Sequence, residues 1–398
     1  MRTLRRARSG LIPHNSLRPR VCLVLILSTL CMLSIALPTP AHAGAVSIRV
    51  LLLQNLATFT VSVPPDYAVL TQPAGLLPVE ADNWRMFQAR DSSGKIRIPE
   101  LGVEVDELRL VPRTKDEVIY AGSKLYRGSL DVKGRAGGLI VVNTLDLEEY
   151  LYGVVPKETP TRWEMAALRA QAIVARTYAL YKRSRQVNRD YDVAAQYIRD
   201  QHYEGFSAEH VRTTQAVNDT QGLVLTCHGE LIPTYYHAES AGYTENSEHV
   251  WSSPHPCLRA VKAQMHPASP YLQWSASLSL QDIRSALAKQ GYTVGVIRSL
   301  EPIGRSPTGR ITLLKIGHKS GETVMRGTDF RLALGPEVIR STRFTVQLRE
   351  GRAFFYGQGW GHGVGLCQWC SQGMAELGYD HEAILIHYYQ GAKLVHYQ

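Results

Sequence analysis

The segment GVVPKETPTRW, residues 153–163, places a single carboxylate, Glu158, between Pro156 and Pro160. The prolines restrict the backbone on both sides, which positions the side chain at low entropic cost. The flanking residues are apolar, and a carboxylic acid against such surfaces can keep its proton and serve as a general acid. A helix start just beyond would favour the anion instead. Glu158 is therefore a candidate acid, with a solvated surface carboxylate as the alternative.

Two other segments carry side chains suited to a binding groove. GWGHGVGLCQW, residues 359–369, has glycine at every second position up to 365, which lets a backbone turn tightly and approach a ligand. His362 and Gln368 could reach in, or the glycines could simply pack the turn under a helix. YYHAESAGYTENSEHVW, residues 235–251, mixes aromatic, small and amide side chains, which suits sugar binding. His237 within it is a candidate contact, and a polar connecting loop is the alternative.

Several catalytic classes have no motif support in this sequence. It contains no Gly-x-Ser-x-Gly elbow, no His-Glu-x-x-His pair, and no Gly-Lys-Ser/Thr after the glycine-rich segment. A cysteine nucleophile at Cys367 lacks a convincing partner. Serine-hydrolase, zinc-protease and phosphate-loop functions are therefore not expected.

The positive charge is concentrated at the N-terminus. The formal charge is +9, but residues 1–43 hold six arginines and no Lys, Asp or Glu, which leaves 38 basic against 35 acidic residues. A nucleic-acid partner is therefore not expected. The basic stretch precedes an apolar run, residues 21–37, and Ala41-His42-Ala43 forms an A-x-A pattern. We predict a signal peptide, residues 1–43, cleaved after Ala43, and an exported protein in the cell envelope or periplasm. An uncleaved N-terminal anchor is the alternative.

Removal of the predicted signal peptide leaves four cysteines, and the sequence does not decide their chemical state. An even number in an exported chain favours disulfides, and the Cys-x-x-Cys spacing also suits zinc. Disulfides, zinc ligation and free buried thiols all stay open for Cys227, Cys257, Cys367 and Cys370.

The elements that must position these residues indicate an α+β fold. Residues 44–145 are rich in short β-branched runs and predict a β-rich N-terminal region. A short helix is expected over 146–155, and a Thr161-x-x-Glu164 capping box predicts the start of a long, buried central helix that extends to about residue 183. A helix after Ser279, strands over 293–355 and two short C-terminal helices follow. We expect residues 146–398 to form the core that carries the site.

Three segments together resemble the sporulation stage II protein D and amidase-enhancer family of cell-wall proteins. YLYGVVPKETPTRWEMAALRAQAIVARTYAL is similar to the family's central signature, and YYHAESAGYTENSEHVW to its Ser-Gly-Gly-x-Thr-Glu loop. GWGHGVGLCQWCSQGMAELGYDHEAILIHYYQGAKL is similar to its C-terminal signature. The chain departs from the usual Met, Gly and Gly at Thr159, Ala241 and Cys370.

The resemblance implies a lytic transglycosylase that acts on peptidoglycan glycan strands and needs no cofactor. Glu158 falls on the family's catalytic glutamate. The same resemblance suggests glycan contacts from Gln171, Tyr203, His237, His362 and Gln368.

Two other functions stay open at this point. The family's enhancer name implies a module that binds peptidoglycan and activates a cell-wall amidase, with Glu158 structural. A lysozyme-like hydrolase would need a second carboxylate, such as Glu239 or Glu245, to position water.

Overall fold

The computed structural model describes residues 46–63, 67–72, 75–77, 85–114, 117–187, 189–251, 253–263, 266 and 268–397. The chain from Ala43 onward forms one compact unit. The fold is α+β, as the sequence predicted. The predicted signal peptide and its cleavage site lie outside the described residues. Within the described ranges, no helix combines the length and apolarity that a bilayer span requires.

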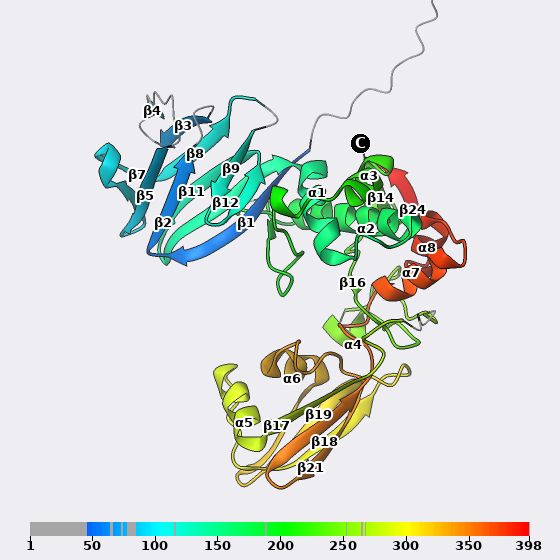
Figure 1. Cartoon of the computed structure of the whole chain (residues 1–398). Coiled ribbons are helices and arrows are strands. Elements are labelled where there is room, and N and C mark those ends of the chain that lie inside the picture. The colour runs from blue at the N-terminus through cyan, green and yellow to red at the C-terminus, as the bar shows by residue number, and fades with distance from the viewer. Residues whose placement is uncertain are drawn as a thin grey trace, which may run out of the picture. The chain divides into compact units, whose positions relative to one another are not determined.

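Two sheets with mainly antiparallel pairing are built from the strands before the first helix, and one later strand, β13, joins the edge of the first sheet (Figure 1). The first has the order β13 (Val193–Ala194), β1 (Ser47–Leu56), β12 (Gly138–Asp146), β11 (Ser129–Arg135), β8 (Glu107–Pro112), β3 (Tyr67–Gln72) and β4 (Gly75–Leu77). The second has the order β10 (Lys124–Arg127), β9 (Val118–Ala121), β2 (Thr58–Val63), β5 (Arg85–Ser92), β6 (Lys95–Ile98) and β7 (Val103–Val105). A 3-10 turn, η1 (Pro99–Leu101), links β6 to β7.

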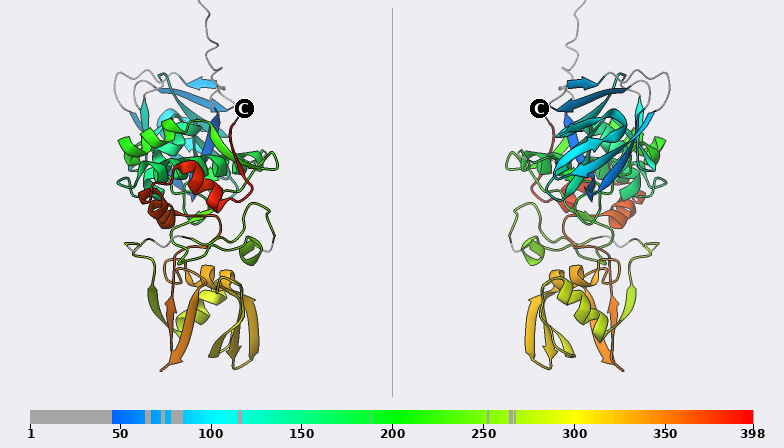
Figure 2. Two further views of the ribbon diagram at one scale, coloured as in Figure 1. Left: turned by 90° about the vertical axis from the view of Figure 1, so that its right-hand side faces the viewer. Right: turned by 90° about the vertical axis from the view of Figure 1, so that its left-hand side faces the viewer.

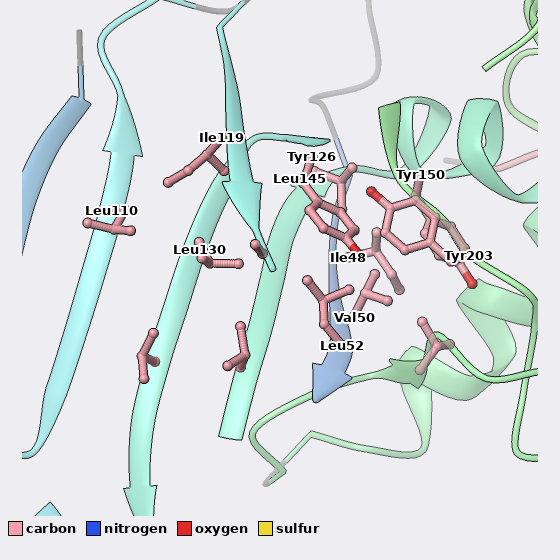
Figure 3. Packing of buried hydrophobic residues seen from close by; sticks show 14 of the residues in the cluster. Ile48, Val50, Leu52, Leu110, Ile119, Tyr126, Leu130, Leu145, Tyr150 and Tyr203 are labelled. Atoms are coloured by element: carbon pink, nitrogen blue, oxygen red, sulfur yellow. The ribbon is translucent and has the colours of Figure 1, made fainter. Parts of the chain in front are cut away.

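Alternating side chains from both sheets build the first hydrophobic core. In β6 the buried residues are Ile96 and Ile98, and β9 buries Ile119 and Ala121, as half-buried strands require. Figure 3 shows this core continuing from Leu110 and Leu130 to Tyr150 on the first helix. The β region and the helices therefore share one apolar interior.

The helix α1 (Leu147–Glu158) is longer than the sequence predicted. Asp146 caps its start by accepting a hydrogen bond from the N–H of Glu148. Pro156 lies inside the helix, whose final residue is Glu158. We expected Glu158 in a loop ahead of the next helix, and this expectation is wrong, because the buried side chains of Val154 and Val155 hold the last turn against the core.

The long helix α2 (Met165–Ser184) is buried over most of its surface, as predicted. The predicted capping box is wrong, since Glu164 is the N-cap and no side chain caps it. Instead the N–H of Glu164 donates to Gln372 from the C-terminal helix α7 (Gln368–Glu376), so a tertiary contact replaces the local cap. Arg176, fully buried on α2, pairs with Glu148 and also donates to two carbonyls.

A second core joins α2 to the C-terminal elements. It packs α2 against the three-stranded sheet β15 (Glu230–Leu231), β14 (Leu223–Cys227) and β24 (Lys393–His396), and against α7 (Gln368–Glu376) and α8 (His381–Tyr388). The helix α3 (Val211–Asp219) and the turn η2 (Phe206–Ala208) precede this sheet. A parallel pair, β16 (Tyr236–His237) with β23 (Leu366–Cys367), links the two segments that the sequence singled out.

Residues 274–357 form a lobe with a hydrophobic core of its own. Its two sheets are β17 (Trp274–Ser279), β22 (Arg352–Gly357), β21 (Phe344–Arg349) and β18 (Ile297–Arg305), β19 (Ile311–His318), β20 (Gly321–Arg326). The helices α5 (Leu280–Lys289) and α6 (Gly327–Leu334) pack on them (Figure 2). Ser279 caps α5 as predicted. The short helix α4 (Glu248–Trp251) lies in the connection before this lobe.

Candidate active site

Glu158 lies at the C-terminal end of α1, where the last turn is closed by the next residue. The N–H and the hydroxyl of Thr159 both donate to the carbonyl of Val155. The partial negative charge of a helix C-terminus disfavours a carboxylate beside it. This dipole therefore acts in the opposite direction from the helix start that the sequence suggested.

Three groups surround the Glu158 carboxyl. The main-chain N–H of His202 donates to its Oε1 at 2.7 Å. The Tyr236 hydroxyl and the Gln368 side chain also form hydrogen bonds with it. These donors come from three distant segments, so the carboxyl is held in one place by tertiary structure.

Burial raises the pKa of Glu158 to about 7. The hydrogen bonds from His202, Tyr236 and Gln368 oppose this shift, because they stabilise the charged form. The residue keeps partial exposure, as a group that meets a substrate must, while the protein around its carboxyl removes much of its hydration. A carboxyl with this pKa is protonated in an appreciable fraction of molecules near neutral pH and can donate a proton.

A series of hydrogen-bonded side chains orients the Tyr236 hydroxyl. The Tyr150 hydroxyl donates to Oε1 of Gln201, and Nε2 of Gln201 lies 3.2 Å from the Tyr236 oxygen. Gln201 is fully buried, so its amide has no water to turn toward. Since the Tyr236 oxygen accepts from Gln201, its hydrogen is free to donate to Glu158.

Gln368 and Gln171, both predicted glycan contacts, meet beneath Glu158. Nε2 of Gln368 donates to the main-chain carbonyl of Glu158 at 3.0 Å and lies 3.3 Å from Oε1 of Gln171. Both residues are buried, Gln171 at 1% exposure and Gln368 at 7%. The structure therefore brings them to the site as groups that position Glu158, with little surface for a sugar.

The two predicted histidines lie next to each other, with ring centroids 5.6 Å apart. His237 is buried, and its ring nitrogens contact the Ser240 hydroxyl and the carbonyl of Val364. Burial lowers the pKa of His237 well below its usual value, so the ring is neutral. His362 is partly exposed. Burial of its ring, with Arg331 and Arg310 nearby, lowers its pKa to about 3.

His362 belongs to an aromatic cluster that the sequence only hinted at. Its ring lies 5.0 Å from that of Trp251 and 6.0 Å from that of Tyr235, and these two rings stack at 4.1 Å. Trp251 is exposed at 39%. Exposed aromatic faces beside a neutral imidazole suit contact with a sugar ring.

Tyr203 does not line the site, and the prediction that it contacts glycan is wrong. It is 3% exposed, and its hydroxyl donates to Asn143 in the β region. Its ring packs between those of Tyr126 and Tyr150, at 5.8 and 5.0 Å, as Figure 3 shows. Tyr203 is a core residue that supports the end of α1.

The glycine-rich loop packs against β16 instead of opening onto a ligand. A Cβ added at Gly361 would lie 2.5 Å from Cβ of His237, and one at Gly365 would lie 2.1 Å from the carbonyl oxygen of Tyr235. Both glycines also have positive φ angles. The alternating glycines therefore allow close packing, and His362 and Trp360 are loop side chains that keep partial exposure.

The four cysteines form two disulfides, Cys227–Cys257 and Cys367–Cys370. Glu239 lies against the second, with its Oε1 3.5 Å from Sγ of Cys370. Among the described residues, these three side chains form the group that could hold a metal ion. Zinc binds thiolates, so the oxidised pair does not fit it.

Sequence reasoning missed three residues of the site: His202, Gln201 and Tyr236. Tyr236 adjoins His237 in a segment that the sequence had singled out, so its aromatic character was a usable signal. His202 acts through its main chain, which leaves no trace in residue type. Gln201 acts through a network that only the folded chain assembles.

Comparisons with known proteins assign the chain to a family. A family model described as Stage II sporulation protein matches residues 135–227, and one described as a domain of unknown function matches residues 255–365. The chain is 31% identical over 367 residues to an uncharacterized protein of Brachyspira hyodysenteriae, covering 90% of this chain and 95% of that protein. It is 30% identical over 273 residues to Stage II sporulation protein D of Bacillus amyloliquefaciens, covering 64% and 75%. The chain belongs to the stage II sporulation protein D family.

A protein named amidase enhancer in Bacillus subtilis is also similar. Identity is 28% over 365 residues, which cover 78% of this chain and half of that protein. The sporulation protein model includes Glu158 and His202, whereas the second model includes the lobe and His362. Tyr236 and His237 lie between the two matched segments, and Gln368 lies after the second.

The three departures from the family's usual residues have distinct structural roles. Thr159 caps α1 directly behind Glu158. Ala241 has a φ of 57°, a left-handed conformation that glycine adopts more easily. Its N–H and carbonyl are held by Glu239 and Arg343. Cys370 forms the second disulfide, two residues after Gln368.

Proposed function

We propose that this protein is a peptidoglycan lytic transglycosylase that works outside the cytoplasm in cell-wall remodelling. The observation that carries the proposal is the single, firmly held carboxyl of Glu158, whose pKa of about 7 lets it act as both acid and base. Family membership supports a cell-wall substrate, and the two disulfides suit an oxidising compartment. Peptidoglycan glycan strands are the proposed partner.

The proposed reaction starts with proton donation from Glu158. Because the His202 N–H donates to Oε1, the acidic proton is best placed on Oε2. Oε2 gives this proton to the glycosidic oxygen between N-acetylmuramic acid and N-acetylglucosamine, and the bond from C1 of muramic acid to that oxygen breaks. The oxygen leaves as a hydroxyl of N-acetylglucosamine.

The same carboxylate then completes the reaction as a base. It takes the proton from the muramic C6 hydroxyl, whose oxygen bonds to C1 and closes a 1,6-anhydro ring. No water is consumed, and Glu158 ends protonated as it began. Because one group acts twice near one position, a fixed mount for Glu158 favours this chemistry.

A hydrolase would need a second carboxylate beside Glu158 to activate water. The two candidates from the sequence, Glu239 and Glu245, are fully buried. Glu239 accepts from the Ala241 N–H and lies against the second disulfide, while Glu245 is engaged by Ser306, Thr308 and His249. Both side chains are buried away from Glu158's exposed surface, and Oε1 of Glu239 and both oxygens of Glu245 are engaged by other groups, which favours the transglycosylase.

A second candidate function is enhancement of a cell-wall amidase, because one similar protein carries that name. In that case the protein binds peptidoglycan, and Glu158 is structural. Peptidoglycan is then cleaved only when an amidase is added.

The deciding experiment is mass spectrometry of muropeptides released from purified peptidoglycan, with the wild-type protein beside Glu158→Gln. Both intact and peptide-stripped glycan are tested. We expect 1,6-anhydro products from the wild type and none from the variant, with both proteins shown to be folded by a cooperative thermal unfolding transition. Reducing ends instead of anhydro ends would indicate a hydrolase. Bound glycan without any product, together with stimulation of an added amidase, would support the enhancer.

A further inference from the structure

The lobe of residues 274–357 carries a cavity of about 730 Å³ that the proposed reaction does not use. Its volume lies in the range of sites for small ligands. The cavity lies where β17 begins, β21 begins and β22 ends. It is lined by Gln273, Trp274, Ser275, Arg305, Gly309, Arg343, Phe344, Thr345, Tyr356, Gly357 and Gln358.

Two guanidinium groups and no carboxylate line this cavity. Arg305 donates to the carbonyls of Gly309 and Phe344, and Arg343 donates to that of Ala241. Within the described part of the chain, neither arginine has an acidic partner in an ion pair. Burial lowers the pKa of Arg305, and no acidic side chain offsets that shift. The cavity therefore carries positive charge that the protein does not neutralise.

The main-chain contacts hold both arginines in place and leave donors unused. Each guanidinium has five N–H groups, of which the carbonyls take only one or two. Gly309 and Gly242 flank Arg343, where an added Cβ would lie 3.8 Å from its Nε and 4.0 Å from its Nη1. Neither glycine places a side chain beside the guanidinium, and Arg343 itself is partly exposed. A fixed, unpaired guanidinium fork matches a carboxylate.

A polar and aromatic row extends from these arginines along the lobe. Tyr356 on β22 pairs with Ser275 on β17 and with Thr345 on β21, so the three side chains form one row across the sheet. The Tyr356 ring is 50% exposed. Hydroxyls beside an exposed ring suit the amide and sugar parts of a ligand whose carboxylate reaches the arginines.

The residues that line the cavity are connected, by a hydrogen bond and by the chain itself, to the two loops near Glu158. Arg343 holds the carbonyl of Ala241, which lies in the loop after His237. Gln358, at the cavity, is four residues before His362 in the glycine-rich loop. A branched polymer bound at the candidate active site could therefore also meet the lobe.

We propose that this cavity is a binding site for carboxylate groups of peptidoglycan, and this proposal rests on the proposed function for its choice of polymer. Peptidoglycan offers carboxylates of two sources: the lactyl group of peptide-free muramic acid, and the stem peptide. Both present the same planar anion to Arg305 and Arg343. The lobe then holds the polymer while Glu158 cleaves it.

The test is calorimetric titration with soluble probes that contain no glycosidic bond between muramic acid and N-acetylglucosamine. N-acetylmuramyl-L-alanyl-D-glutamate presents stem carboxylates, and N-acetylmuramic acid presents the lactyl carboxylate. N,N′-diacetylchitobiose is the neutral control. We expect at least one acidic probe to bind and the neutral probe to bind at least tenfold more weakly. Binding of the peptide probe alone assigns the stem, and binding of N-acetylmuramic acid alone assigns the lactyl group.

Variants place the binding in the cavity. We expect Arg305→Gln with Arg343→Gln to weaken binding of the acidic probe at least tenfold, and Tyr356→Ala to weaken it measurably. Among the described residues, the side chain of Tyr356 forms no hydrogen bond, so we expect the Tyr356→Ala variant to fold. The matched control is Arg298→Gln, which removes an exposed arginine of the same lobe outside the cavity lining. Glu158→Gln should bind as the wild type does.

Several outcomes would overturn the proposal. These are no binding of either acidic probe to the folded wild type, binding that the arginine variants leave unchanged, or inorganic phosphate competing as strongly as the acidic probes. The muropeptide assay separates this failure from that of the proposed function. Anhydro products without cavity binding reject the cavity alone. Arginine-dependent binding without anhydro products rejects the transglycosylase and keeps the cavity.

Discussion

The main-chain N–H of His202 donates to Oε1 of Glu158 at 2.7 Å, although 44 positions separate the two residues. This bond fixes one carboxyl oxygen and leaves the other to carry the proton. Because the donor is a backbone group, replacing the His202 side chain would not remove it. The acid of the site is thus oriented by the fold of the 195–205 segment.

The pH dependence of cleavage should follow the protonation of Glu158. Its pKa is raised to about 7, so the protonated fraction falls about tenfold for each pH unit well above 7. We expect the initial rate of anhydro-muropeptide release to decline along the same slope between pH 7.5 and 9. A rate that is flat across this range would exclude Glu158 as the proton donor.

Tyr236→Phe should move this alkaline limb to higher pH. The Tyr236 hydroxyl stabilises the Glu158 anion, so its removal raises the pKa of the carboxyl further. The measurement is the pH profile of initial rates, with Tyr152→Phe as the control. Tyr152 lies on the same helix, but its hydroxyl donates to Asn218. An unshifted limb in Tyr236→Phe would show that the hydroxyl does not act on Glu158.

The stability of the folded protein should fall as pH rises through the titration of Glu158. In the unfolded chain this carboxyl titrates near its ordinary value of 4.5, and in the folded protein at about 7. Between these values the folded state binds more protons, so the free energy of unfolding decreases with rising pH. The loss is complete above the folded value and amounts to at most roughly 3 kcal/mol.

Glu158→Gln removes this penalty because glutamine does not ionise. We expect the variant to gain stability over the wild type at pH 8 and to differ little at pH 4. Urea unfolding at the two pH values measures the difference. The raised pKa would be contradicted if the variant were less stable than the wild type and the difference were the same at pH 8 and at pH 4.

The buried ion pair of Arg176 with Glu148 should matter far more than its exposed counterpart on the same helix. Arg176→Leu removes the cation that pairs with Glu148 and one hydrogen-bond donor from each of the carbonyls of Leu223 and Val217. We expect a loss of about 3–5 kcal/mol in the free energy of unfolding. Arg169→Leu, which breaks a surface pair with Asp219, should cost about 1 kcal/mol or less. Equal losses in the two variants would argue against this difference.

The two disulfides should contribute unequally to stability. Cys227–Cys257 closes a loop of 30 residues, whereas Cys367–Cys370 spans three. Loop-closure entropy predicts a loss of about 3–4 kcal/mol when the first pair is replaced by serine, and about 1.5 kcal/mol for the second. Urea unfolding of the two double variants measures the difference. A larger loss from the second pair would mean that its packing against Glu239 dominates.

Local sequence patterns correctly predicted several elements of the fold. The strands before residue 146, the buried α2 and the Ser279 cap of α5 were all predicted, because strand alternation, helical periodicity and capping depend on neighbours in the chain. Glu158 was singled out by the prolines on either side of it and by the resemblance of its segment to the family's central signature. These features require no knowledge of distant contacts.

Tertiary structure decided the environment of Glu158. The contacts of the last turn of α1 with the core place Glu158 at a helix end, and Gln372 replaces the predicted cap of α2. Tyr203 packs into the core, while Tyr236 and the His202 N–H reach the carboxyl. Partners for the cysteines were likewise undetermined by spacing. These outcomes depend on which distant segments share a buried volume, and local residue patterns do not encode that information.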